Sequence, residues 1–217
     1  MEIRVMENIM DANNKIADEN RAFFREKGIT AVNMMASPGA GKTSVIVKLI
    51  ELLGREGKFG VIEGDIASSI DAEKIDGMGI PVVQINTGGG CHLDANMIRT
   101  VATETPAFEN TVLFIENVGN LVCPSSFDLG ENIKIVVASV PEGHDKPYKY
   151  TSMFEAADAI ILNKTDLAPY IDFDREYFYR GVGAVNGKAR VFEVSCKTGE
   201  GFDELAGYIK GFCTGER

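Results

Sequence analysis

Short apolar runs alternate along the chain with longer segments in which apolar residues recur every three or four positions. The runs are almost continuously apolar, which predicts strands buried on both faces of a sheet. The longer segments predict helices that bury one face. The predicted strands cover residues 31–35, 60–62 (continuing toward Asp65), 81–85, 111–115, 133–140, 159–162 and 190–194.

The predicted helices lie between these strands. They cover residues 5–27, the segment after Thr43, residues 69–76, the segment through Met97 and Val101, and residues 201–212. Alternating strands and helices predict an α/β fold with a doubly wound, mainly parallel sheet. The 217 residues show no repeat, low-complexity tract or linker, so we expect a single domain over 1–217, with a leading helix in about 1–28 and the core in 29–217.

A turn of small residues separates the first predicted strand from the helix after it. Backbone N–H groups of such a loop surround phosphate oxygens at a helix N-terminus. Lys42 would reach the β- and γ-phosphates, and the Thr43 hydroxyl would hold Mg²⁺. Ala36 stands where the usual pattern has glycine, and a positive φ there would be strained. The predicted nucleotide contacts are Ser37, Pro38, Gly39, Ala40, Gly41, Lys42, Thr43 and Ser44.

The composition narrows the range of partners. A formal charge of −10 argues against binding a phosphate backbone, so nucleic acid is not an expected partner. No apolar stretch approaches membrane-spanning length, and Met1–Val5 lack the layout of a signal peptide. Four cysteines are too few for a disulfide framework in a chain of this size. We therefore expect a cytoplasmic protein with no membrane partner.

Two later loops predict the base. Asn163-Lys164-Thr165-Asp166 follows a late strand, and the Asp166 carboxylate can accept hydrogen bonds from the ring N1–H and the exocyclic amine of guanine. Adenine offers no matching pair, and an unmatched buried carboxylate is costly. Asn163 would tie this loop to the phosphate loop, and Lys164 would lie along the base. Ser195-Cys196-Lys197 follows the next strand and resembles the loop of GTP-binding proteins that closes over the base; a simple turn is the alternative.

Acidic residues at strand ends predict the catalytic region. Asp65 and Glu116 each close a strand, where a carboxylate binds Mg²⁺ directly or through water, so Thr43, Asp65 and Glu116 form the predicted magnesium set. Gly119 would place its N–H against the γ-phosphate. Asn120 follows it, where many GTPases carry a water-orienting glutamine, so we expect slow hydrolysis with Asp65 orienting the water. The predicted catalytic residues are Lys42, Asp65, Glu116 and Gly119.

A second set of residues predicts a transition-metal site. Cys91-His92 lies in one predicted strand-end loop and Cys123 in another. Two thiolates and an imidazole suit Ni²⁺ or Zn²⁺, and the ligand set does not choose between the two ions. Three ligands leave one coordination position open, or allow two chains to share the metal. The alternative is a buried cysteine pair with an incidental histidine.

Together these motifs resemble the HypB family of hydrogenase maturation GTPases, which belong to the SIMIBI-type phosphate-loop GTPases. The resemblance extends from about residue 5 to the end of the chain. The segments around Cys91 and Cys123 distinguish the chain from the related urease-maturation GTPase, whose metal site is usually a Cys-Pro-His triplet. The segments that carry the resemblance are 36–43, 61–65, 86–95, 114–124, 142–147 and 163–166.

The resemblance implies a cytosolic GTPase of phosphate-loop fold, with GTP or GDP and Mg²⁺ as ligands, that dimerises when GTP is bound. It implies a role in delivering nickel to [NiFe]-hydrogenase, with a HypA-type nickel metallochaperone as partner and the hydrogenase large subunit as client. It also implies that Cys91, His92 and Cys123 bind Ni²⁺ or Zn²⁺ at or near the dimer interface.

Some positions depart from the family or leave alternatives open. The remaining cysteines are Cys196 and Cys213, which we interpret as structural, so we expect neither an amino-terminal cysteine-rich nickel motif nor nickel storage. Lys146 and Lys149 would contact nucleotide or a second subunit, or form a solvated turn, and His144 stands where we expect an acidic or neutral residue.

Three other functions stay open: a metal-binding scaffold with incidental GTP hydrolysis, an ATP-driven switch, and the urease-maturation role.

The spacing of the motifs predicts a coupling. Glu116 to Cys123 is one short segment, so γ-phosphate contact at Gly119 would move Cys123. GTP and GDP would then favour different loop arrangements, and the coupling between nucleotide and metal would be reciprocal.

Overall fold

The computed structural model describes residues 9–54, 57–65 and 70–213, and its strands all run in the same direction. Seven strands form one sheet in the order β3-β2-β4-β1-β5-β6-β7. This arrangement confirms the predicted α/β fold with a parallel sheet. The strands are β1 (Thr30–Ala36), β2 (Phe59–Asp65), β3 (Val82–Asn86), β4 (Val112–Glu116), β5 (Ile133–Ser139), β6 (Ala159–Asn163) and β7 (Arg190–Glu193).

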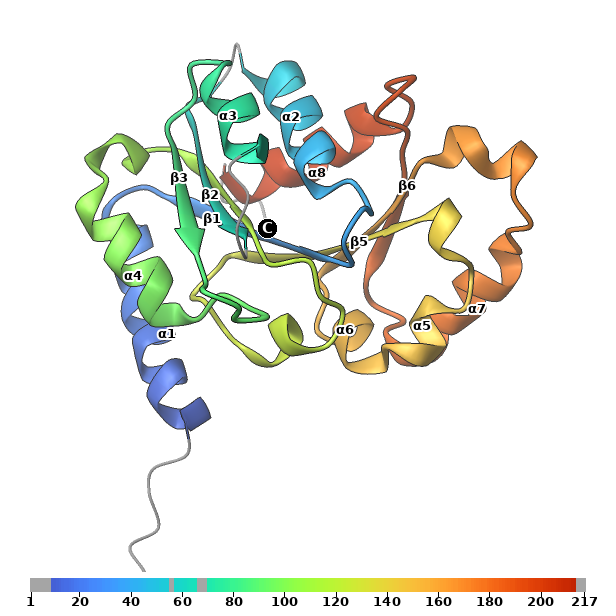
Figure 1. Cartoon of the computed structure of the whole chain (residues 1–217), viewed down its shortest axis with the longest axis horizontal. Helices are drawn as coiled ribbons and strands as arrows, with labels where there is room; N and C mark the ends of the chain where they lie inside the picture. Colours follow the sequence, from blue (N-terminus) through green and yellow to red (C-terminus); the bar gives the residue numbers. More distant parts are fainter. Residues whose placement is uncertain (1–8, 55–56, 66–69, 214–217) are drawn as a thin grey trace, which may run out of the picture.

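Helices cover both faces of the sheet (Figure 1). One face carries α2 (Lys42–Leu53), α3 (Ile70–Asp76) and α8 (Phe202–Cys213). The other face carries α1 (Ile9–Glu26), α4 (Ala95–Glu104), α5 (Lys146–Lys149), α6 (Thr151–Glu155) and α7 (Arg175–Val185). Four short 3-10 helices complete the described chain: η1 (Pro106–Phe108), η2 (Cys123–Ser126), η3 (Val140–Glu142) and η4 (Thr165–Tyr170).

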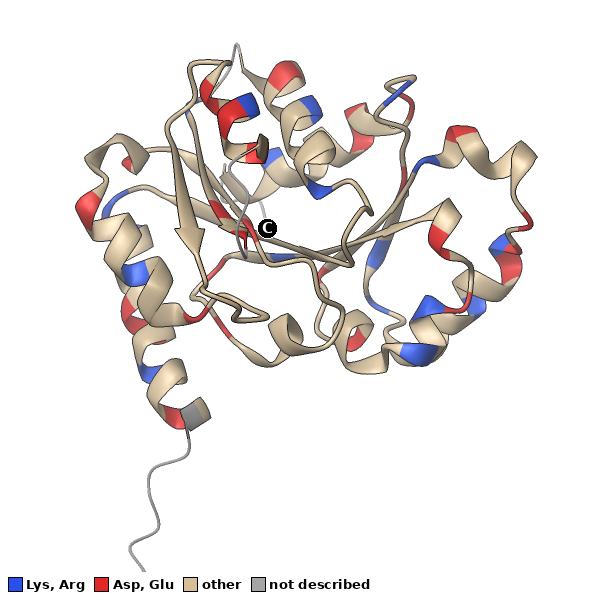
Figure 2. Cartoon of the chain, viewed as in Figure 1, with Lys and Arg blue, Asp and Glu red and all other residues tan. Residues whose placement is uncertain are grey.

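The core is divided by the sheet, and the central strand β1 contributes to both sides. Val32 and Met34 pack with α2 and α8 on one face. On the opposite face, Ala31 packs with α1 and α4, and Met35 packs with α6 and α7. Asn33, in the middle of β1, is the buried polar exception and is hydrogen-bonded. Acidic and basic residues are interspersed over both helical layers (Figure 2).

The element bounds agree with the sequence except in a few places. The expected strand 133–140 ends at Ser139, and Val140 begins η3. The predicted first helix is α1, which ends at Glu26 just before Gly28, whose φ is +66°. Val5 and Ser69, at the starts of two predicted helices, lie outside the described residues.

Helix α7 is not among the helices that the sequence pattern predicts. Its buried residues Phe178, Gly181 and Val182 have helical spacing, but glycines at 181 and 183 weaken the pattern because glycine disfavours helix interiors. Gly181 is needed for packing, since a Cβ there would lie 2.6 Å from Cε2 of Tyr148 on α5. The glycine that obscures the helix in the sequence therefore permits a close contact between two helices.

The strain expected at Ala36 does not occur. Ala36 ends β1 in strand conformation, paired with Val137 of β5. Within the described part of the chain, the positive φ values outside glycine belong to Asn110 and Lys164. No helix in that part has the length and apolar character needed to cross a membrane.

Candidate nucleotide and metal site

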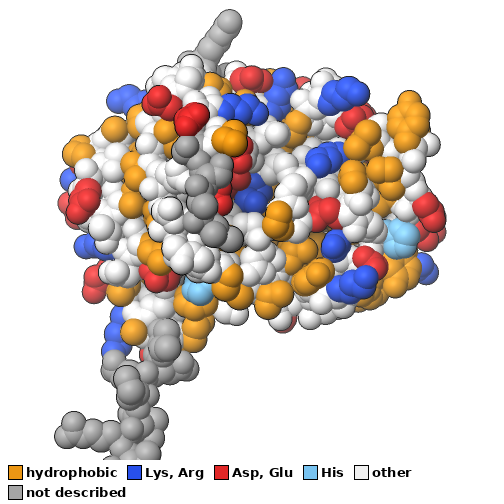
Figure 3. All heavy atoms as spheres, viewed as in Figure 1, with side chains coloured by type: hydrophobic (Ala, Val, Ile, Leu, Met, Phe, Trp, Pro, Cys, Tyr) orange, Lys and Arg blue, Asp and Glu red, His pale blue; other side chains and the backbone are white. Residues whose placement is uncertain are grey.

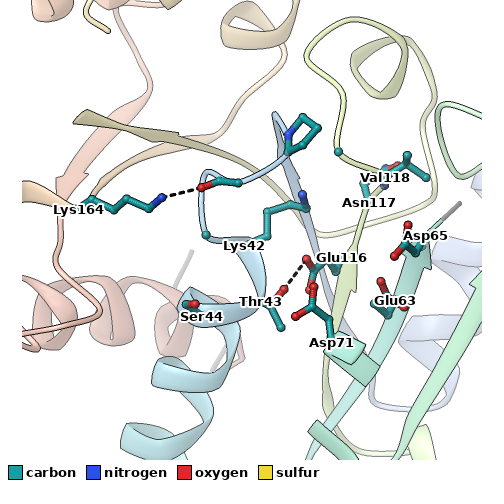
Figure 4. A pocket seen from close by; sticks show the side chains of 15 residues that line it. Lys42, Thr43, Ser44, Glu63, Asp65, Asp71, Glu116, Asn117, Val118 and Lys164 are labelled. Carbon is teal, nitrogen blue, oxygen red and sulfur yellow. Dashed lines mark hydrogen bonds between the residues drawn. The ribbon is translucent and has the colours of Figure 1, made fainter. Parts of the chain in front are cut away.

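The phosphate loop lies between β1 and α2, at the carboxyl edge of the sheet, beside a pocket of about 560 Å³. Figure 3 shows a hollow on the viewed face with acidic and basic side chains inside it. Ligands of open α/β sheets bind at this edge, where the strand order reverses. The lining residues are Pro38, Gly39, Gly41, Lys42, Thr43, Ser44, Glu63, Gly64, Asp65, Asp71, Glu116, Asn117, Val118, Gly119 and Lys164 (Figure 4).

Glycines shape the loop where a side chain would not fit. Gly39 and Gly41 have φ values of 79° and 101°, a region that favours glycine. A Cβ on Gly41 would lie 2.5 Å from Nδ2 of Asn163. Helix α2 begins directly afterwards at Lys42, so its free N–H groups and positive dipole end face the pocket, as an anion site requires.

Glu142, which follows β5, supports the phosphate loop from outside the pocket. Its carboxylate accepts hydrogen bonds from the hydroxyl of Ser37 and, at 2.8 Å, from the hydroxyl of Ser139. Ser37 is thereby held against the end of β5. Glu142 was not predicted as a site residue and appears only within a segment of family resemblance. Its neighbours in the sequence do not indicate that its carboxylate binds Ser37, which follows a different strand.

The base-side residues form one hydrogen-bonded group. Asn163 Nδ2 donates to the Ala40 carbonyl at 3.0 Å. Lys164 Nζ donates to the Gly39 carbonyl at 2.7 Å, a bond that Figure 4 shows. Ser195 Oγ donates to Asp166 Oδ1 at 2.7 Å, which orients that carboxylate. The loop containing Asn163 is thus tied to the phosphate loop, as the sequence predicts.

The remaining base-loop residues lie beside the main pocket rather than in its lining. Cys196 Sγ donates to Asn163 Oδ1 at 3.4 Å, and burial raises the pKa of this thiol. Lys197 lies with Cys196 and Ser44 along a second hollow of about 310 Å³. Ser44 lines both hollows.

Two buried glutamates stand side by side on neighbouring strands of the pocket floor. Glu63 of β2 pairs in register with Glu116 of β4. Thr43 Oγ1 donates to Glu116 Oε1 at 2.9 Å, whereas Oε2 of each glutamate is buried without a hydrogen-bond partner. Burial raises the pKa of both carboxyls to about 7, and for Glu63 the charges of Glu116 and Asp65 add to the effect. Glu63 was not predicted as a site residue, because no local motif marks it.

This part of the pocket fits a hard divalent cation. Thr43, Glu116 and Asp65 present oxygen atoms to the same pocket, together with Asp71 of α3 (Figure 4). Oxygen donors are the ligands that Mg²⁺ takes, and the unpartnered carboxylate oxygens of Glu63 and Glu116 are suited to meet a cation or its water shell. Asp71 was also missed, because an acidic residue in a first helical turn resembles an ordinary dipole partner.

Gly119 lies directly against the phosphate loop. A Cβ at this position would stand 3.0 Å from Cγ of Pro38 and 3.1 Å from its nitrogen. Only glycine permits this approach without displacing one of the loops. The segment after β4 therefore borders the pocket at the position where the sequence predicts γ-phosphate contact.

Cys91, His92 and Cys123 form a compact cluster. One ligand atom from each lies within 4.8 Å of the others, and Cys91 Sγ is 3.5 Å from Nδ1 of His92. The His92 ring stacks on Phe127, with ring centroids 3.8 Å apart. A hydrogen bond with Cys123, together with burial, raises the pKa of the Cys91 thiol. The fold thus brings together the two loops that are distant in sequence, and the cluster fits a soft or borderline metal ion.

The segment after β4 connects the pocket to this cluster through two asparagine side chains. Asn117 Oδ1 accepts hydrogen bonds from the N–H groups of Leu93 and Val118, both at 3.0 Å. Asn120 Nδ2 donates to the Cys91 carbonyl at 3.3 Å. The residues that border the pocket are therefore hydrogen-bonded to the loop that carries Cys91 and His92.

Comparisons with known proteins identify the family. Residues 30–193 match the family model described as the CobW/HypB/UreG nucleotide-binding domain. The hydrogenase maturation factor HypB of Azotobacter vinelandii is 48% identical over 96% of this chain and 69% of its own length. The chain belongs to the HypB family.

Solved HypB structures share its fold. HypB from Archaeoglobus fulgidus superposes with a TM-score of 0.88 at 40% identity, covering 94% of this chain and 99% of that one. HypB from Helicobacter pylori in complex with nickel also gives 0.88, at 34% identity, over 94% and 96% of the two chains. The family resemblance inferred from the motifs is confirmed.

Residues 144–149 overlap the segment of HypB resemblance at 142–147, and the exposed Lys149 side chain is consistent with the expected solvated turn as well as with a surface contact. Lys146–Lys149 is helix α5, and Lys149 Nζ lies 2.5 Å from the Asp145 carboxylate. His144 Nδ1 accepts a hydrogen bond from the Asp174 N–H at 3.1 Å. Cys213 is exposed near the end of α8.

The paired glutamates predict a pH-dependent stability for the protein free of nucleotide and metal. The raised pKa means that Glu63 is protonated in the folded state up to about pH 7, so its burial becomes costly as pH rises from about 4.5 to 7. Glu63→Gln is expected to raise the free energy of unfolding at pH 8 by roughly 3 kcal/mol, since the pKa rises from 4.5 to about 7 and one pKa unit is about 1.4 kcal/mol. At pH 4.5 this gain should fall below about 0.5 kcal/mol, because the carboxyl is then protonated in the folded state and half protonated in the unfolded state.

Urea denaturation at both pH values measures this effect. The exposed carboxylate Glu155 of α6 provides the control, and Glu155→Gln should leave stability nearly unchanged at either pH. A stabilisation by Glu63→Gln that is equal at pH 4.5 and pH 8 would contradict the interpretation.

Proposed function

We propose that this chain is a GTPase that hydrolyses GTP slowly and assists nickel insertion into [NiFe]-hydrogenase. Residues 1–217 would act as one GTPase domain, and the GTP-bound form would dimerise. Membership of the HypB family supports the role, and the pocket beside the phosphate loop supports the nucleotide. A HypA-type metallochaperone would supply the metal, and the hydrogenase large subunit would receive it.

Guanine recognition would rest on Asp166. Its carboxylate is oriented by Ser195, and the loop is fixed to the phosphate loop through Asn163 and Lys164. A rigid carboxylate discriminates well because it is left unpaired by the wrong base. Cys196 would act indirectly by holding the Asn163 side chain.

In the proposed hydrolysis, Lys42 and the N-terminus of α2 stabilise charge on the phosphates, and the Gly119 N–H binds the γ-phosphate. Mg²⁺, when bound by Thr43, Glu116 and Asp65, supplies positive charge at the phosphate oxygens. Asp65 accepts a hydrogen bond from the attacking water and orients it. Slow turnover is expected because the Asn120 side chain is engaged by Cys91 and Val122 rather than by the pocket.

Nickel would be the cargo of the protein rather than a resident cofactor. Cys91, His92 and Cys123 would bind it with two sulfur atoms and one nitrogen atom, and an open coordination position would allow transfer. The same donors accept Zn²⁺, which is therefore the competing ion. The nickel complex of the Helicobacter pylori relative supports nickel as the ion to test first.

The observation that carries the proposal is a pair of hydrogen bonds with the loop of Cys91: Asn117 Oδ1 accepts from the Leu93 N–H, and Asn120 Nδ2 donates to the Cys91 carbonyl. A rearrangement of residues 116–120 on γ-phosphate contact would change these bonds and hence the separation of Cys91 from Cys123. Metal affinity would then depend on the nucleotide, and nucleotide affinity on the metal to the same degree.

Titration of Ni²⁺ in the presence of GDP and of a non-hydrolysable GTP analogue tests the coupling. We expect affinities that differ by about fivefold or more, the usual range of allosteric coupling, with sedimentation reporting a dimer for the analogue alone. Asn120→Ala should reduce the ratio toward one, whereas the exposed neighbour Asn96→Ala should keep it. Equal Ni²⁺ affinities in the unmutated protein would exclude nucleotide-controlled delivery and favour a metal scaffold.

A second prediction concerns the base. Asp166→Ala is expected to weaken GTP binding by about two orders of magnitude or more and to remove the preference over ATP, because a charge-assisted pair of hydrogen bonds is lost. Ser195→Ala, which keeps the carboxylate but removes the hydroxyl that orients it, should have a smaller effect. Equilibrium competition between labelled GTP and ATP measures both. A preserved preference in Asp166→Ala would move base recognition elsewhere and reopen the ATP-driven alternative.

A further inference from the structure

Helix α1 buries an unusual face. Its buried positions after the first turn are Asn13, Ala17, Asn20 and Phe24, which lie on one side of the helix. Two of these four side chains are amides, although leucine would pack the same interface without desolvating polar groups. A buried amide costs free energy unless it is hydrogen-bonded. Asn13 and Asn20 are therefore better explained by the hydrogen bonds that they make than by packing alone.

Each asparagine bridges the same two segments of the chain. Asn13 accepts a hydrogen bond from the Ala95 N–H at 2.9 Å and donates to the Asp128 carbonyl at 2.8 Å. Asn20 Nδ2 donates to the carbonyls of Ala95 and Leu129, both at 2.9 Å. Both side chains thus connect the first residue of α4 to the loop at 128–129.

These two segments lead directly from the metal-binding candidates. Ala95 begins α4 three residues after His92, and Asp94 caps that helix by accepting from the Met97 N–H at 2.8 Å. On the other side, Phe127 stacks on the His92 ring and immediately precedes Asp128. The bridged residues, Ala95 and residues 128–129, therefore lie a few residues beyond His92 and Cys123 along the chain. Holding them together fixes the two segments that carry the cluster.

A charged contact reinforces one side of this bridge. The Arg21 guanidinium pairs with the Asp128 carboxylate, and Asp128 Oδ1 also accepts from the Gly130 N–H at 2.9 Å. The backbone N–H of Gly130 and the carbonyls of Asp128 and Leu129 are thus all hydrogen-bonded. The loop that follows Cys123 is fixed in place by α1.

We propose that Asn13 and Asn20 are positioning residues for the metal site, setting the separation between the Cys91–His92 loop and the Cys123 segment. The inference rests on the proposed metal site at Cys91, His92 and Cys123. Metal affinity depends strongly on the residues that orient the ligands, even where they do not touch the ion. Helix α1, which lies outside the nucleotide pocket, thereby determines how tightly the cluster holds its cargo.

The test uses Co²⁺ and Ni²⁺ titrations of the full chain, followed by the thiolate-to-metal charge-transfer absorption. Asn13→Ala and Asn20→Ala are each expected to weaken metal affinity by about tenfold or more and to change the intensity of that band. Binding of GDP should stay within about twofold of the unmutated protein. Asn13→Asp keeps the acceptor for Ala95 but loses the donor to Asp128, so a bridge predicts that it behaves like Asn13→Ala.

Asn186 provides the matched control. Asn186 lies at the carboxyl end of α7. Its Nδ2 also donates to backbone carbonyls, those of Phe154, Glu155 and Ala157. Asn186→Ala should lower thermal stability to a similar degree while metal affinity and the charge-transfer band stay unchanged. Equal losses of metal affinity in Asn186→Ala and Asn13→Ala would show a general structural effect and overturn the inference.

Two further outcomes separate this inference from the proposed function. Unchanged metal binding in folded Asn13→Ala and Asn20→Ala, with Cys123→Ala abolishing it, would overturn the positioning role and keep the metal site. Metal binding that survives both Cys91→Ser and Cys123→Ala would overturn the site and the inference together. If an alanine variant does not fold, as judged by GDP binding, Asn13→Leu decides, because leucine keeps the size of the side chain and removes both hydrogen bonds.

Discussion

Every strand of the sheet points the same way, and the arrangement of the site depends on this constraint. Because the strands are parallel, their carboxyl ends meet at one edge, and the loops that follow β1, β4 and β6 converge there with Asp65 at the end of β2. β1 lies near the middle of the sheet, so the phosphate loop is flanked on both sides. The contact of Gly41 with Asn163 depends on this arrangement, since the two residues are far apart in sequence and share no hydrogen-bonded strand pair.

A buried polar chain crosses the apolar core beneath the site. Glu131 accepts from Asn33 at 2.9 Å, Asn33 accepts from Asn117 at 3.2 Å, and Asn117 holds the N–H of Leu93. Networks of this kind are costly if any member is unpaired, so they favour one arrangement over all others. The loop that follows β4 therefore has a defined position relative to both the central strand and the cysteine loop. A two-state change in that loop would have to replace a complete set of hydrogen bonds rather than adjust it gradually.

The sequence predicted what is local and periodic. Apolar runs located the seven strands of the described sheet. The phosphate loop, Asp166 and Gly119 could be named as site candidates from the sequence because short motifs carry their chemistry within a few residues. Glu63 and Asp71 were missed because their importance comes from strand pairing and helix docking, which bring them beside Glu116. Asn13 and Asn20 were not singled out from the sequence, because polar side chains in a helix usually face solvent. Their burial is apparent only once α1 is packed against the rest of the protein. The proximity of Cys91 to Cys123 likewise required either the fold or the family resemblance.

The charge of the pocket has a consequence for the form in which a nucleotide enters. Four acidic side chains, Glu63, Asp65, Asp71 and Glu116, line the same hollow as the two cations Lys42 and Lys164. The pKa values of about 7 leave Glu63 and Glu116 partly charged near neutral pH. A bare triphosphate would bring several negative charges toward this acidic floor, and at short range in a partly buried site such repulsion is weakly screened. A triphosphate already neutralised by a divalent cation avoids it. In the proposed GTPase, the pocket would therefore act as an electrostatic filter that selects the cation complex over the free nucleotide, before any contact with the base is made.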